Sequence, residues 1–175
     1  MMAALLLLAV MTAQAPQDPA ATVTAVRQLA SAKSWDAFDA RVESIPPDDP
    51  AWERLPQVVY QAGIERKDLP SVIDRLARVA GATTSPAIKA SAFIVIGRAY
   101  RRQGDLTAAT SALERAAAAP GTPAAEQATG IIYEITHLSP GLQAPPIDAR
   151  ARNGRSISLA ALRGRPVVLV FWGTS

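Results

Sequence analysis

Helix signals and apolar residues repeat 37 positions apart in this chain, from Asp68 to Asp105. Each aspartate is followed by apolar side chains at three- and four-residue intervals, the spacing of one face of an α-helix. In the first copy these are Val72, Leu76, Val79 and Ala80, and in the second they are Ala109, Leu113, Ala116 and Ala117. A unit this short cannot bury its apolar face alone and must stack on a neighbour. We therefore expect a mainly α fold, with stacked helical hairpins over residues 19–138.

The second copy predicts a complete helical hairpin. Ser85 and Pro86 form an N-cap and first-turn pair, and the helix that follows them stops at Gly104. Asp105 then opens a second helix, which ends near Pro120. Small residues in such a hairpin let the two helices approach, and larger ones fill the groove between them. In residue type and spacing the hairpin resembles a tetratricopeptide repeat, through Gly97, Tyr100, Gly104, Asp105, Ala109, Leu113 and Ala116.

Further helices are expected on both sides of this hairpin. In the earlier copy, Asp49 would cap and Pro50 would open a first helix whose apolar face holds Trp52, Leu55, Val58 and Val59. Residues 20–32 and 34–43 form a third pair, with Trp35, Phe38 and Val42 on the face of its second helix. Thr122 and Pro123 would start a last helix, in which Ile131, Ile132 and Ile135 cover the exposed end of the stack.

The composition changes after the predicted helices. Prolines and a glycine between residues 139 and 146 indicate a linker, because proline cannot continue a helix. Beyond it, Asn153-Gly154 lies between short β-prone segments and predicts a tight hairpin turn. The segment from Pro166 to Trp172 is apolar on both faces, as in a central strand of a sheet. We expect the strands and helices that would cover this strand to come from outside this sequence.

The segment 141–175 resembles the opening of a TlpA-like thiol-disulfide oxidoreductase domain of thioredoxin fold, which is related to the redoxin and alkyl hydroperoxide reductase proteins. The similarity consists of a Gly-x-x-Ala-Pro entry at Gly141, a short hairpin, a Leu-x-x-Leu-x-Gly-x-Pro turn from Leu159 to Pro166, and Phe171-Trp172 with Thr174. The resemblance implies that Cys-x-x-Cys should follow directly. Peroxiredoxins share the entry and the turn, and a peroxiredoxin fragment is a third interpretation.

No cysteine is present in the sequence, so the reactive thiolates that the redox chemistry of that family requires are missing here. We therefore expect residues 147–175 to be the incomplete start of a thioredoxin-like domain, and this chain to be inactive as a reductase. No catalytic residue, metal ligand or cofactor is assigned. The favoured hypothesis is the N-terminal part of an exported oxidoreductase that acts on disulfide-containing proteins, whose helical repeats position the redox domain or bind a protein or peptide partner. The alternative is a non-enzymatic helical scaffold.

The N-terminus has the features of a secretory signal peptide over residues 1–15. Met1 to Met11 is uncharged and apolar, and Ala13-Gln14-Ala15 gives a small-x-small pattern before a cleavage point. The resulting expectation is a periplasmic or extracellular protein. No basic residue precedes the apolar run, and Pro16 would directly follow the expected cleavage point, so an uncleaved membrane anchor is a second interpretation, and a buried N-terminal helix is a third.

The sequence argues against nucleic-acid binding, a histidine-based site and a cation site. Arg150, Arg152, Arg155, Arg163 and Arg165 outnumber the single acidic residue after Gly141, but no aromatic platform accompanies them, so we expect no nucleic-acid partner. His137 is the only histidine, which argues against a histidine-based metal site or a Ser-His-Asp triad. Asp48 and Asp49 could be imagined as ligands of a hard cation, but their position between prolines favours a helix cap.

Overall fold

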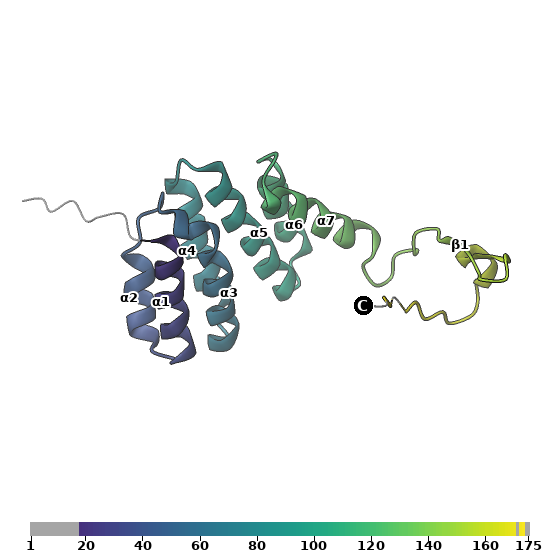
Figure 1. Cartoon of the computed structure of the whole chain (residues 1–175), viewed down its shortest axis with the longest axis horizontal. Coiled ribbons are helices and arrows are strands. Elements are labelled where there is room, and N and C mark those ends of the chain that lie inside the picture. The colour runs from purple at the N-terminus through teal and green to yellow at the C-terminus, as the bar shows by residue number, and fades with distance from the viewer. Residues whose placement is uncertain (1–17, 171, 174–175) are drawn as a thin grey trace, which may run out of the picture. The chain divides into compact units, whose positions relative to one another are not determined.

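The computed structural model describes residues 18–170 and 172–173 (Figure 1). Residues 1–15, the predicted signal peptide, lie outside the described residues, as do Phe171 and Thr174 of the predicted redox motif. The chain divides into two compact units, Met1–Ile132 and Tyr133–Ser175. This division falls within the last α-helix, whereas the predicted domain boundary at residue 139 lies just beyond the end of that helix.

The first unit consists of helices that pack in series. They are α1 (Pro19–Ser31), α2 (Trp35–Glu43), the 3-10 turn η1 (Pro50–Glu53), α3 (Leu55–Arg66), α4 (Leu69–Ala82), α5 (Pro86–Gln103), α6 (Leu106–Ala117) and the first part of α7 (Pro123–His137). The pairs α1–α2, α3–α4 and α5–α6 are in contact, and α3 packs against both α1 and α5 (Figure 1). The described fold is therefore mainly α, as predicted.

Side-chain caps place most of the helix starts where the sequence predicted them. Asp68 Oδ1 accepts a hydrogen bond from the Ser71 backbone N–H at the start of α4, and Asp105 Oδ1 accepts one from Ala108 at the start of α6. Ser85 Oγ accepts the N–H of Ile88 in α5. These bonds satisfy N–H groups that have no partner inside a helix. Gly104 ends α5 in the left-handed conformation, with φ of +86°, which glycine adopts without steric cost.

The earlier copy does not begin with one continuous helix. The sequence predicted a helix opening at Asp49 and Pro50, but the structure has η1 over Pro50–Glu53 and a separate α3 from Leu55. Asp49 does cap the first turn, accepting the Ala51 N–H at 2.8 Å. Pro56 explains the break, because its ring would clash with the carbonyl of the residue four positions earlier in an unbroken helix.

Glycine allows close helix contact in both hairpins, at different positions of the repeat. A Cβ on Gly97 of α5 would lie 2.6 Å from Leu113 Cγ of α6. In the earlier hairpin the close approach is at Gly63 of α3, where a Cβ would overlap Val72 Cγ2 of α4. Gly63 is 37 positions before Tyr100, not before Gly97. The two copies therefore use the same device, a missing side chain facing a large one, at turns of the helix that do not correspond.

The core of the first unit includes Leu76 and Leu113 of the repeat pattern together with apolar residues of the other helices. The largest side chains that are almost fully buried are Trp52, Phe38, Leu55, Leu76, Ile88, Leu113, Val26, Val42 and Pro56. Trp52, in η1, is only 1% exposed, so the turn that replaces the predicted start of α3 still contributes to the core.

The second unit contains the last turn of α7 and a small hairpin. Strands β1 (Asp148–Arg150) and β2 (Ser156–Ser158) pair antiparallel, with Ala149 opposite Ile157, and the 3-10 turn η2 (Leu159–Leu162) follows. The predicted hairpin therefore forms around Asn153-Gly154. Its loop has three residues, because Gly154 N–H donates to Ala151 O and Ala151 N–H donates to Arg155 O, with Gly154 at φ of +80°.

The strand predicted over Pro166 to Trp172 is not formed in the described residues of that segment. Val168 and Trp172 are each 85% exposed, and the backbone there has no neighbouring strand. An isolated extended segment leaves its N–H and C=O groups to water and gains nothing from cross-strand pairing. The predicted strand is therefore not confirmed in the described residues of this segment.

Candidate functional site

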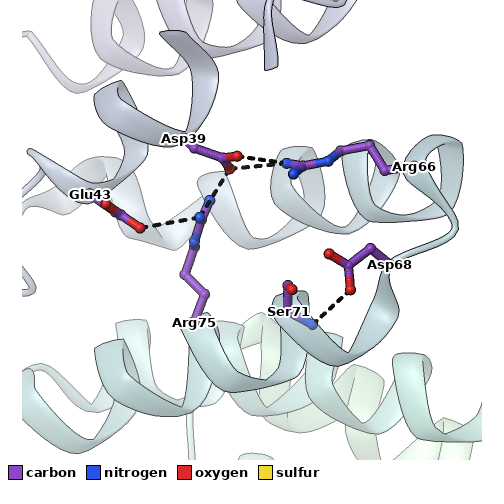
Figure 2. Close-up of polar contacts among 6 residues, drawn as sticks. All are labelled: Asp39, Glu43, Arg66, Asp68, Ser71 and Arg75. Carbon is purple, nitrogen blue, oxygen red and sulfur yellow. Dashed lines mark hydrogen bonds and ion pairs between the residues drawn. The ribbon is translucent and has the colours of Figure 1, made fainter. Parts of the chain in front are cut away.

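A cluster of charged residues joins three helices of the first unit (Figure 2). Asp39 of α2 lies between Arg66, at the end of α3, and Arg75 of α4, with N–O distances of 3.0 Å to each. Arg75 also approaches Glu43, one turn after Asp39, at 3.5 Å. The Arg66 guanidinium stacks over the Trp35 ring at 5.5 Å from its centroid. The cluster borders a cavity of about 130 Å³.

The protonation state of the cluster follows from these contacts. Burial alone would raise the pKa of Asp39, but hydrogen bonds from Arg66 and Arg75 outweigh it and hold that pKa below its ordinary value. The same bond to Asp39 raises the pKa of Arg66. Hydrogen bonds from Ser71 lower the pKa of Asp68. Because each arginine has a carboxylate partner, the cluster is charge-compensated and serves to hold α2 against α3 and α4.

A second, larger hollow lies on the odd-numbered helices. This groove has a volume of about 210 Å³ and receives side chains from η1 and α3, from α5, and from the start of α7, all within the first unit. Its apolar part includes Pro56, Ile94 and Val95. Glu53 and Arg98 are its charged residues. We call this hollow the α3–α5–α7 groove.

Arg98 links the three helices of the groove. Its Nη1 donates to Gln57 Oε1 of α3 and its Nη2 donates to Gln127 Oε1 of α7, each at 3.2 Å. Among the described residues, no carboxylate lies within ion-pair distance of Arg98. The groove therefore contains a half-buried cation held by neutral amides, in contrast to the compensated cluster around Asp39.

Asp48 and His137, which the sequence offered as candidate ligands, contact residues of neighbouring loops or of their own helix in the structure. Asp48 does not cap a helix: it accepts from the Thr83 hydroxyl at 2.7 Å and from the Thr84 N–H at 2.7 Å, tying the loop between α4 and α5 to the loop before η1. These bonds, led by that from Thr83, lower the pKa of Asp48. His137, at the end of α7, stacks on Tyr133 with ring centroids 4.3 Å apart. In the described ranges, no three acidic or histidine side chains gather as metal ligands.

Arg98, Gln57 and Gln127 were not predicted from the sequence as functional residues. One signal was available, because Arg98 interrupts an apolar run from Ala92 to Gly97 in the middle of a helix. A charge within such a run indicates either a buried partner or a functional surface. Its two partners are 41 and 29 positions away, and no local pattern connects them.

Comparisons with protein-family models, with curated proteins and with solved structures gave no match to this chain. The described residues include no helix with the length and apolar character that crossing a bilayer requires.

Proposed function

We propose that the first unit is a tetratricopeptide-like scaffold that binds an extended protein segment in the α3–α5–α7 groove, and that residues 141–175 belong to a TlpA-like thiol-disulfide oxidoreductase. The scaffold would position the redox domain or recruit its disulfide-containing substrate outside the cytoplasm. The observation that carries the proposal is the groove itself. It is formed by successive odd-numbered helices, the side on which a stack of helical hairpins presents a continuous surface.

Three features support the scaffold half of the proposal. The helices pair along the chain and stack on the next pair, the hairpins approach through glycine, and caps recur at Asp68 and Asp105. The groove combines an apolar floor with polar side chains at its edge, a composition that suits a peptide with alternating apolar and polar residues.

The redox half depends on the motif resemblance of residues 141–175. With no cysteine in the sequence, the chain cannot form a mixed disulfide, and we expect insulin reduction no faster than a buffer blank. The gene provides the direct test: the reading frame, or that of an intact homologous gene, should continue after the Ser175 codon into Cys-x-x-Cys within a few residues. A stop codon in a verified genomic sequence, with no cysteine pair downstream, would leave the non-enzymatic scaffold as the function.

The groove is tested by peptides selected from a random displayed library on the purified 175-residue protein. Ser91→Trp adds a bulky neutral side chain inside the groove, and Ser111→Trp makes the same change on the exposed surface of α6. Fluorescence polarisation should show at least about tenfold weaker peptide binding for Ser91→Trp, a loss of roughly 1.4 kcal/mol. Ser111→Trp should bind as the parent protein does. Equal binding by all three proteins would show that the groove is not the binding surface.

A further inference from the structure

The chemistry of Arg98 fixes the orientation of its two glutamine partners. A guanidinium can only donate hydrogen bonds, so the amide groups of Gln57 and Gln127 must both turn their oxygens toward it. The amide NH2 groups of the two glutamines consequently point away from Arg98 and keep their donors for another acceptor. The side chains that carry these NH2 groups and the remaining N–H groups of Arg98 line one groove, and apart from the two glutamine oxygens no acceptor among the described residues is bonded to Arg98.

Arg98 has no ion-pair partner among the described residues of the groove. Arg66 and Arg75 share the carboxylate of Asp39, whereas the described residues offer Arg98 only neutral oxygens. Ala124, the second residue of α7, also lines the groove, and the backbone N–H at that helical position has no partner within the helix. The positive end of the α7 dipole adds to the attraction for an anion.

Glu53 limits what kind of anion fits. It also lines the groove, yet it lies beyond ion-pair distance of Arg98. A ligand with several adjacent carboxylates would bring negative charge against Glu53, while a single carboxylate flanked by apolar side chains would not. The apolar floor formed by Pro56, Ile94 and Val95 can take those flanking side chains.

We propose that Arg98, with the NH2 groups of Gln57 and Gln127, binds a single acidic side chain within an extended partner segment, and that its apolar neighbours lie on the floor of the groove. This inference rests on the proposed function, since it names the class of segment that the scaffold would bind. The planar fork of arginine can bind a carboxylate through two parallel hydrogen bonds, which makes such a contact both strong and directional.

The test uses mixtures of fluorescein-labelled peptides of random sequence, acetylated and amidated at their ends, with glutamate, glutamine or a run of glutamates fixed at the centre. We expect the full-length protein to retain at least about tenfold more of the single-glutamate mixture than of the glutamine mixture, as hydrogen bonds to a charged group would give. The run of glutamates should bind less well than the single glutamate. A glutamine-centred mixture with a free terminal carboxylate distinguishes recognition of a chain end.

Two substitutions test the residue assignment. Arg98→Met keeps the unbranched stem of the side chain and removes the charged guanidinium group, and should abolish the preference for glutamate. Gln57→Glu changes an exposed position and supplies Arg98 with an internal carboxylate, so it should abolish the preference even if Arg98→Met fails to fold. Thermal melting of each variant shows whether its fold is retained.

The outcomes separate this inference from the proposed function. Equal retention of the glutamate and glutamine mixtures, with both blocked by Ser91→Trp, would overturn the inference and leave the groove as a binding surface. Preference for the free terminal carboxylate alone would overturn it in favour of chain-end recognition. If the glutamate preference survives Gln57→Glu, the carboxylate is bound elsewhere and the inference is wrong. If no mixture is retained, both proposals fail.

Discussion

Gly97→Ala is the most direct test of how the second hairpin packs. The new Cβ would lie 2.6 Å from Leu113 Cγ, 2.9 Å from Leu113 Cδ2 and 3.1 Å from the Ala109 carbonyl oxygen. Carbon atoms in good contact are about 3.5–4.0 Å apart, so Leu113 must move by roughly 1 Å. Leu113 is fully buried and Ala109 contributes backbone, so neither can yield without repacking α5 against α6.

Two opposing effects determine how much Gly97→Ala changes the free energy of unfolding. Overpacking of this kind costs about 1–3 kcal/mol, and the contact with Cγ, near the base of a buried side chain, places it at the upper end. Replacing glycine by alanine within a helix returns roughly 1 kcal/mol. We expect a net destabilisation of about 1–2 kcal/mol, which for a chain of this length lowers the melting temperature by roughly 2–4 °C per kcal/mol.

Thermal melts followed by far-UV circular dichroism measure the stability of the parent protein and its variants. Gly81→Ala is the matched control, because Gly81 lies in α4 and a Cβ added there would meet no atom within 4 Å, so this variant should gain about 0.4–1 kcal/mol. The double variant Gly97→Ala with Leu113→Ala should cost less than the sum of the single changes, because the second removes the atoms that clash. A Gly97→Ala protein as stable as the parent would refute the close packing of α5 on α6.

The remaining predictions concern charge, the C-terminal segment and export. Asp39→Asn should destabilise the protein at neutral pH. Because the pKa of Asp39 is lowered in the folded state, its contribution is fully present above the ordinary value of 3.8 and is lost as the pH falls through the folded value, so parent and variant should converge in acid melts. A shortened protein ending at Ser139 should keep a cooperative helical melt and scatter less light than the full chain, because the uncharged segment from Pro166 exposes unpaired backbone; loss of the cooperative melt would place the tail within the helical fold. Residues 1–20, fused to a periplasmic reporter, should direct its secretion, and a cytosolic reporter would contradict the predicted localisation.

The sequence determined the helices because the signals that begin and end them are local. Asp68, Ser85 and Asp105 each cap the helix that follows within three residues, and Gly104 ends α5 through its own backbone freedom. The hairpin around Asn153-Gly154 is local in the same sense. The break before α3 was missed although Pro56 was visible, because the apolar spacing continued across it.

Only the tertiary structure decided which polar side chains meet. Asp39 reaches Arg66 across 27 positions, and Arg98 reaches Gln57 across 41, distances over which no periodic pattern carries information. The sequence also did not predict where the helices of each hairpin approach most closely. The tetratricopeptide-like pattern includes Gly97, at the close approach of α5 and α6, but the close approach of α3 and α4 is at Gly63, which does not correspond to Gly97 in the repeat. The apolar segment from Pro166 shows that local propensity alone is not sufficient. Its residues favour a strand, but a strand forms only when another strand supplies hydrogen-bond partners. Helix starts are fixed by bonds within a few residues, whereas grooves, ion pairs and sheets depend on what the rest of the chain brings alongside.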